Sequence, residues 1–217
     1  MTIPGWSPIA LSRDIEAGSS AGTLLEGQEI VVWRDQAGTA HVWEDRCPHR
    51  GMKLSFGFVR GDHITCLYHG WAFEGSGRCT GIPAHPALDV PATICATTYA
   101  ATEAAGMIWV FQPLGDPAGP PPDDATVTPV RSLVLDVPLE AALAALPEAF
   151  EGPLIREGQV ALLDAGAVQL RIGLQALSAT RSALHITALG APGTGLLLDL
   201  LERAQWLRRL AGEEIPA

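Results

Sequence analysis

Four metal-binding side chains lie in two short segments of the first half of the chain. Cys47 and His49 form a C-x-H pair, Cys66 and His69 form a C-x-x-H pair, and sixteen residues separate the two pairs. Each pair can bind a metal from the tip of one loop, and a glycine within two residues of each histidine permits a tight turn. Two thiols and two imidazoles suit a [2Fe–2S] cluster in which one iron takes both thiolates and its neighbour takes both imidazoles.

A structural zinc site is the main alternative, because Zn²⁺ also accepts two Cys and two His ligands. Zinc fingers usually place two cysteines on one knuckle and two histidines on the other. Here each pair contains one cysteine and one histidine. The mixed pairs therefore favour the iron–sulfur cluster over zinc.

The sequence around the two pairs resembles the Rieske domain of the Rieske non-haem iron oxygenases. This resemblance implies that Cys47 and Cys66 bind one iron of a [2Fe–2S] cluster, that His49 and His69 bind the other, and that none of the four is a catalytic residue. It covers most of the first half of the chain and rests on the segments 42–46 (VWEDR), 54–57 (LSFG), 68–71 (YHGW), 77–79 (GRC), 82–84 (IPA) and 106–110 (GMIWV).

Composition and charge limit the classes of protein to which the chain can belong. The formal charge of −10 in 217 residues argues against a nucleic-acid partner. No run of about 18 apolar residues is present, so we expect no membrane span. The first residues lack a basic start and an apolar signal core, which predicts a cytoplasmic protein. In that compartment Cys79 and Cys95 are expected to be free and mostly buried thiols.

The pattern of apolar residues predicts a mainly β, α+β chain with two domains. Short, closely spaced strands predict an antiparallel β domain of the Rieske type over 1–111. The proline-rich stretch 112–129 is interpreted as a semi-stiff linker. Residues 130–217 are expected to form a small α+β domain, with strands from Val130 and Val168, and it resembles a reduced helix-on-sheet domain. Two helices, one beginning near Pro138 and one over 195–210, should pack on this sheet, and a shallow ligand pocket beneath the last helix is the alternative.

No mononuclear iron site can be recognised in the sequence. The oxygenases that the chain resembles activate O₂ at an iron held by two histidines and a carboxylate. Outside the two pairs the histidines are His41, His63, His85 and His185, and none belongs to the D/N-x-x-H-x-x-x-x-H pattern. The first three are expected to be surface or capping residues, and His185 is expected to face away from Leu184 and Ile186 in a strand.

Two classes of function remain open. The first is an electron-transfer protein that receives single electrons from a reductase or ferredoxin and passes them to a separate oxygenase component. Arg50 and Lys53 beside the first pair either steer an acidic donor or are simply solvated. The second is an oxygenase subunit, of ring-hydroxylating or demethylating type, with an unrecognised or partner-supplied iron, or a ligand-binding sensor that keeps the cluster. A homo-oligomer is compatible with the resemblance.

Overall fold

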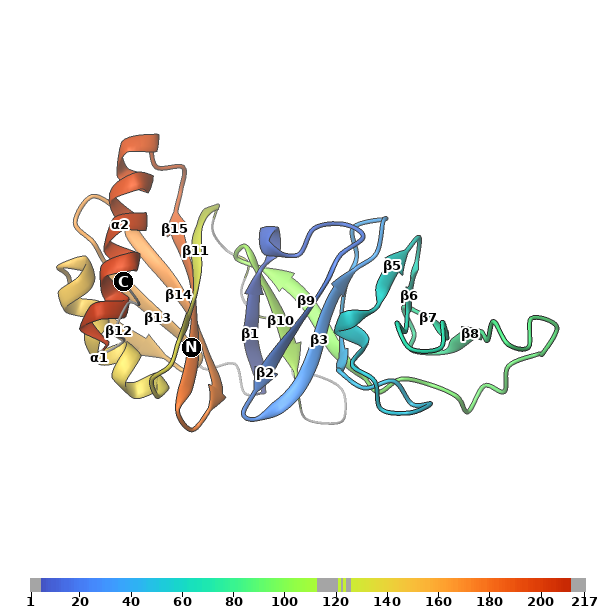
Figure 1. Ribbon diagram of the computed structural model, residues 1–217. Helices are drawn as coiled ribbons and strands as arrows, with labels where there is room; N and C mark the ends of the chain where they lie inside the picture. The colour runs from blue at the N-terminus through green and yellow to red at the C-terminus, as the bar shows by residue number, and fades with distance from the viewer. Residues whose placement is uncertain (1–4, 113–120, 122, 124–125, 212–217) are drawn as a thin grey trace. The chain divides into compact units, whose positions relative to one another are not determined.

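Strands dominate the computed structural model, which describes residues 5–112, 121, 123 and 126–211 (Figure 1). The predicted fold class, mainly β with two α-helices, is confirmed. By internal contacts the chain divides into two compact units. One comprises 1–13, 25–27 and 102–217, and the other comprises 14–24 and 28–101. The domain ranges 1–111 and 130–217 stay a prediction, and most of the linker 112–129 lies outside the described residues.

The unit of residues 14–24 and 28–101 is built from hairpins. Strands β3 and β4 pair through Val31 and Trp43, and β4 pairs with β9 through Val42 and Tyr99. A separate antiparallel sheet has the order β5-β6-β7-β8. The elements of these hairpins, together with the short 3₁₀ helix η2, have the bounds β2 Ser20–Leu25, β3 Gln28–Arg34, β4 Ala40–Glu44, η2 Leu54–Phe56, β5 Phe58–Arg60, β6 His63–Thr65, β7 Ala72–Glu74, β8 Cys79–Gly81 and β9 Thr98–Ala104.

Large apolar side chains from these hairpins form a core that includes both candidate ligand cysteines. Trp33 and Trp43 meet edge to face, with ring centroids 5.0 Å apart, and both are fully buried. Phe73 of β7 and Ile64 of β6 belong to the same cluster. The core therefore anchors the strands from which the two ligand loops emerge.

The other unit contains a five-stranded antiparallel sheet of order β11-β15-β14-β13-β12. Both helices cover one face of this sheet, and β1 contacts β14 and β15 from the other face (Figure 1). Strand β1 itself pairs with β10. The elements, with the 3₁₀ helix η1, have the bounds β1 Trp6–Leu11, η1 Ser12–Asp14, β10 Met107–Phe111, β11 Val127–Leu135, α1 Leu139–Phe150, β12 Leu154–Glu157, β13 Val160–Asp164, β14 Gln169–Ser178, β15 Arg181–Leu189 and α2 Thr194–Leu210.

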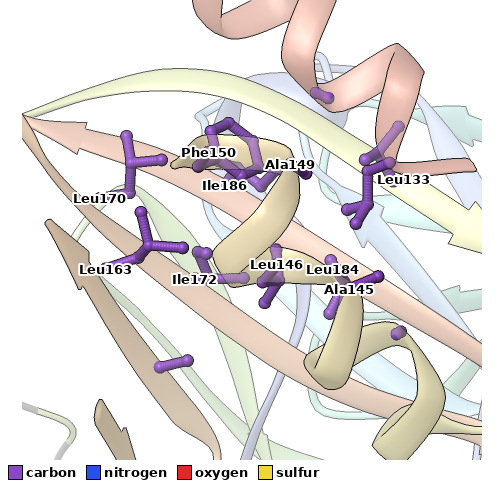
Figure 2. Close-up of a cluster of buried hydrophobic side chains, with 14 of the residues drawn as sticks. Leu133, Ala145, Leu146, Ala149, Phe150, Leu163, Leu170, Ile172, Leu184 and Ile186 are labelled. Carbon is purple, nitrogen blue, oxygen red and sulfur yellow. The ribbon is translucent and has the colours of Figure 1, made fainter. Parts of the chain in front are cut away.

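The helix-covered face forms a dense apolar core (Figure 2). Leu146 and Phe150 of α1 pack with Leu184 and Ile186 of β15 in one buried cluster. Helix α2 adds three buried side chains, spaced as one helical stripe, to the same cluster: Leu200, Ala204 and Leu207. The predicted packing of both helices on an antiparallel sheet is confirmed.

Two local expectations for this unit are corrected by the structure, and one hairpin was not expected. The alternation of apolar and polar residues over 168–175 indicates a half-buried strand, whereas β14 is buried on both faces because Pro8 and Met107 pack closely against Gly173. Strand β11 begins at Val127 and not at Val130, because the sheet admits Pro129 at a register shift in an edge strand. The hairpin β12–β13 was not predicted, because both strands are short and β12 is mostly exposed.

Candidate metal centre

The first candidate ligand loop is a tight turn that begins directly after β4. The Cys47 amide donates a hydrogen bond to the Met52 carbonyl oxygen at 2.8 Å, and the Gly51 amide donates to the Cys47 carbonyl oxygen at 2.8 Å. Gly51 has a φ of +71°, a conformation that a side chain disfavours. The loop therefore folds back on itself and presents His49 at its tip.

The second loop repeats this hydrogen-bonding pattern between β6 and β7. The Cys66 amide donates to the Trp71 carbonyl oxygen at 2.9 Å, and the Gly70 amide donates to the Cys66 carbonyl oxygen at 3.0 Å. Gly70 has a φ of +69°. In both loops the glycine is four residues after the cysteine, while the histidine moves from the second to the third position. The shared turn explains why both pairs end in a glycine.

The two cysteines lie side by side in the interior. Cys47 and Cys66 are each 2 % exposed. Burial, the largest cause, and the neighbouring Cys66 thiol together raise the pKa of the Cys47 thiol to about 11, although the backbone N–H groups of His49 and Arg50 lower it. Two buried thiols cannot both ionise unless a cation compensates the charge, and bound iron would supply that cation.

The two histidines meet at the loop tips. The ring centroids of His49 and His69 are 4.7 Å apart, and the His49 ring stacks on Trp71 at 4.2 Å with the planes almost parallel. His69 is exposed, whereas His49 is half-buried. The buried Nδ1 atom of His49 has no hydrogen-bond partner. Desolvation, the nearby His69 and the Arg50 cation lower the pKa of His49, so its ring is neutral and able to ligate a metal.

A buried carboxylate holds the two ends of the first ligand loop together. Asp45, two residues before Cys47, accepts hydrogen bonds from the Ser55 amide at 2.7 Å and from the Ser55 hydroxyl at 2.6 Å. Asp45 is only 3 % exposed. Ser20 reaches the same place by donating to the Ser55 carbonyl oxygen. These hydrogen bonds, called here the Asp45–Ser55 clasp, position the loop, and neither residue is a proposed metal ligand.

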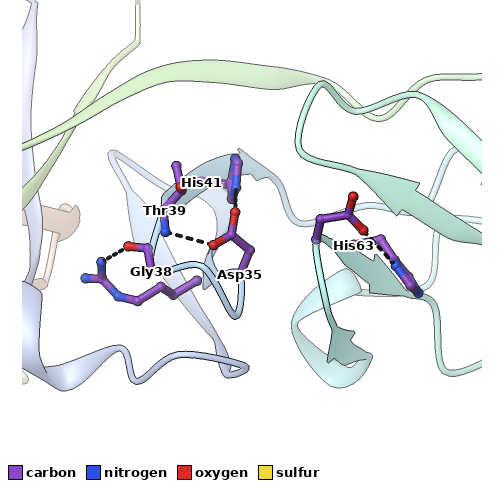
Figure 3. Close-up of polar contacts among 7 residues, drawn as sticks. Asp35, Gly38, Thr39, His41 and His63 are labelled. Atoms are coloured by element: carbon purple, nitrogen blue, oxygen red, sulfur yellow. Dashed lines mark hydrogen bonds and ion pairs between the residues drawn. The ribbon is translucent and has the colours of Figure 1, made fainter.

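The other histidines do not belong to the two ligand pairs. His41 pairs with Asp35 at 3.1 Å, and His63 lies 3.3 Å from Asp62 (Figure 3). The His41 ring also stacks on Trp33. His85 is exposed, as expected. The expectation of a surface or capping role is wrong for His41, because its ring stacks on Trp33 and its Nε2 atom hydrogen-bonds with the Asp35 carboxylate.

His185 is a satisfied core residue. It is 3 % exposed, its Nε2 atom lies 2.9 Å from Gln175 Oε1, and its Nδ1 atom lies 3.0 Å from Ser132 Oγ. Burial lowers its pKa to about 4. Its ring lies on the sheet face opposite the helix-packed Leu184 and Ile186, as the sequence pattern predicted. Both ring nitrogens have protein partners, which distinguishes it from His49.

The two remaining cysteines differ from each other. Cys79 is buried, and burial raises its pKa, whereas Cys95 is exposed. The expectation that both are free is confirmed, but the expectation that both are buried is wrong for Cys95. Cys95 forms an isolated backbone bridge with Arg78.

The donor geometry is that of two pairs and not of one compact site. Within the described ranges, no group of three or more His, Cys, Asp or Glu side chains could hold a single metal ion. The structure nevertheless brings together the four residues that the sequence indicated, two buried thiols and two imidazoles with one unpartnered buried nitrogen. This donor set fits a dinuclear cluster, which needs two ligands on each iron.

Two features of the site were not predicted from the sequence. Trp71 is half-buried and stacks on His49, and the Asp45 carboxylate accepts hydrogen bonds from Ser55. Ring stacking has no sequence signal. The buried Asp45 could have been suspected only from its place between a tryptophan-containing strand and the first ligand pair.

Comparison with known proteins agrees with this centre. Residues 5–95 match the Rieske [2Fe-2S] domain. The chain is 29 % identical to Oxidoreductase NdmD of Pseudomonas putida over 95 % of its own length and 39 % of the relative. It is 49 % identical to 4beta-methylsterol monooxygenase of Methylococcus capsulatus over 42 % of its length and 25 % of the relative. The chain thus spans at most about two fifths of each of these relatives.

Solved structures share the fold over nearly the whole chain. Apo dicamba monooxygenase superposes with a TM-score of 0.71 at 16 % identity, covering 96 % of this chain and 83 % of that one. NdmA of Pseudomonas putida CBB5 superposes with a TM-score of 0.68 at 16 % identity, covering 98 % and 83 %. Strands and helices therefore follow the same arrangement in these proteins.

The fold and the donor set define an iron–sulfur protein with a Rieske domain, and the cofactor of that domain is a [2Fe–2S] cluster. Proteins of similar sequence include Oxidoreductase NdmD and the oxygenase subunit of 3-chlorobenzoate-3,4-dioxygenase of Comamonas testosteroni, to which the chain is 36 % identical over 49 % of its length and 25 % of the relative. None of the helices described here is long and apolar enough to span a membrane.

Proposed function

We propose that the chain is a Rieske electron-transfer protein in an oxygenase-type system, in which Cys47 and Cys66 bind one iron and His49 and His69 bind the other. The observation that carries this proposal is the buried Nδ1 atom of His49, which faces no protein partner although its ring lies 4.7 Å from His69. A buried polar atom without a partner lowers the free energy of unfolding, and a bond from that atom to iron would remove this destabilisation.

A bound Rieske cluster takes up and releases one electron at a time. The surrounding residues set how it is held. The amides of His49 and Arg50 direct their N–H groups at the Cys47 sulfur, which stabilises a thiolate there. Trp71 covers one face of the His49 ring and keeps water from it. His69 is the exposed ligand, so its ring edge is the shortest route between the centre and solvent.

A reductase or ferredoxin would act as electron donor and an oxygenase component as acceptor. A complete oxygenase subunit is the second candidate, favoured by the superposition of dicamba monooxygenase on 96 % of the chain. The two candidates differ in iron content, because an oxygenase needs one further iron that is not bound to sulfide.

The test is the amount of iron and sulfide per chain after loading with Fe(II) and desalting. The electron-transfer function predicts two irons and two sulfides, with an EPR signal of a mixed nitrogen and sulfur cluster after reduction. A third tightly bound iron, together with O₂ consumption in the presence of a reductase alone, would establish the oxygenase instead. A colourless protein loaded with zinc would contradict both.

A further inference from the structure

Only one of the four proposed ligands of the centre, His69, is exposed at the surface. Of the four ligands, Cys47 and Cys66 are buried, His49 is half-buried and His69 is exposed. The surface around His69 is therefore where a redox protein approaches most closely. The inference that follows rests on the proposed function and concerns the chemistry of that partner.

The charge of the ligand-bearing segment is opposite to the charge of the whole chain. Residues 46–96 contain five basic and three acidic residues, a net charge of +2, while the complete chain has a net charge of −10. The remaining residues therefore carry −12. The segments 46–57 and 66–72, which hold all four ligands, contain no acidic residue, and neither does the neighbouring segment 79–88.

Two arginines on the first ligand loop supply the free positive charge. Arg46 and Arg50 are exposed, and within the described part of the chain neither forms an ion pair or a side-chain hydrogen bond. Arg50 lies close enough to act on the His49 pKa, and Arg46 lies beside Gly51. Lys53, which the sequence also suggested, is neutralised by Glu29 at 2.6 Å. Arg46 and Arg50 are therefore available to a partner protein, whereas Lys53 is already paired.

Exposed apolar side chains lie beside the arginine-bearing loop. Leu67 and Tyr68 of the second ligand loop are 51 % and 56 % exposed, and the Tyr68 ring lies against His69. A shallow cleft of about 280 Å³ is lined by Gly70 of the second ligand loop and by Leu88, which is 49 % exposed. An apolar centre with a charged rim is the usual anatomy of a protein–protein contact.

We infer that the surface formed by Arg46, Arg50, Leu67, Tyr68 and Leu88 is the docking face for an acidic one-electron donor protein. Arg46 and Arg50 steer the donor electrostatically, and the apolar side chains form the contact over His69. One electron leaves the donor, which is oxidised, and reduces the centre behind His69. The local charge, and not the net charge of the chain, selects the partner.

Stopped-flow reduction by a plant-type [2Fe–2S] ferredoxin, an acidic donor of low potential, tests this inference. Two acidic proteins repel each other through their net charges, so net charge alone predicts that salt accelerates the reaction. The docking face predicts the opposite, a second-order rate constant that falls as salt is added. R46E/R50E should lower that constant at low salt by about tenfold or more.

Arg209→Glu is the matched control, because Arg209 is exposed on α2 and the substitution reverses one charge far along the chain. It should leave the rate nearly unchanged. With reduced protein and the basic acceptor cytochrome c, R46E/R50E should instead raise the rate, a reversal that misfolding cannot produce. A rate that rises with salt, or equal losses in R209E and R46E/R50E, would overturn the docking face while dithionite still reduces the cluster. Absence of any cluster signal would overturn the proposed function as well.

Discussion

Two histidines withdrawn from solvent show how differently the two units use the same side chain. His49 has a buried Nδ1 atom with no partner, and its ring is flanked by Trp71 and His69. His185 is fully enclosed, and both of its nitrogens contact protein groups, Gln175 and Ser132. The lesson is that burial alone does not mark a metal ligand, whereas an unsatisfied nitrogen beside other donors does.

The surroundings of the two histidines differ in the same way. The sheet that contains His185 buries a large apolar cluster beneath α1 and α2, which stabilises it without a cofactor. The ligand loops are held by a few backbone hydrogen bonds and by the Asp45–Ser55 clasp. We therefore expect the loss of metal to destabilise the ligand loops and the loss of side-chain packing to destabilise the sheet.

The largest expected effect is the loss of the cluster when a ligand thiol is removed. Cys47→Ser or Cys66→Ser should abolish the visible absorbance and the iron content, because serine replaces a soft thiolate by a poor iron ligand. Cys95→Ser is the matched control, since Cys95 is exposed and not among the proposed ligands. Retention of a full cluster in Cys47→Ser would contradict the ligand assignment.

The next largest effect concerns stability and should leave the cluster intact. His185→Ala creates a cavity and removes one partner each from Gln175 and Ser132, so the free energy of unfolding should fall by about 2–4 kcal/mol. Urea titration followed by circular dichroism measures this change. His63→Ala, at a partly exposed position, should change it by less than about 0.5 kcal/mol. Loss of iron from the His185→Ala variant would mean that His185 is also required for metal binding.

Alanine substitutions at Gly57 and Gly195 should have smaller and opposite effects on stability. A Cβ atom at Gly57 would collide with the carbonyl oxygen of Thr65, the residue directly before Cys66, so Gly57→Ala must displace one ligand loop from the other. We expect a cost of about 1–3 kcal/mol and faster loss of the cluster in urea. Gly195, in α2, has open space around it, and Gly195→Ala should be neutral or slightly stabilising. Equal cluster loss in both variants would refute this reasoning.

The smallest expected effect is a dependence of stability on pH. Burial lowers the pKa of His185 to about 4, below its unfolded value near 6.5. Between these values the unfolded chain binds more protons than the folded chain, so stability is complete above about pH 6.5 and declines as the pH falls towards 4. The loss between pH 7 and pH 5 should be at most about 2 kcal/mol. His185→Gln should remove this part of the slope, and an unchanged slope would show that other groups cause it.

Much of the fold was predictable because its signals are local. Helix α2 follows from one apolar stripe, and the spacing of Asp199 and Arg203 allows the i,i+4 ion pair that the structure contains at 2.8 Å. The burial of β14 on both faces was not predictable, because its second cover comes from β1, which precedes it by about 160 residues. Patterns along one strand do not reveal what packs from elsewhere in the chain.

The sequence by itself determined the candidate donor set, because the spacing of cysteine, histidine and glycine fixes two tight turns that each carry a thiol and an imidazole. Only the tertiary structure decided which histidines have an open nitrogen. Gln175 and Ser132 reach His185 from two other strands, whereas no protein group reaches Nδ1 of His49. Hydrogen-bond partners are supplied by neighbours in space, and a spacing along the chain carries no information about them.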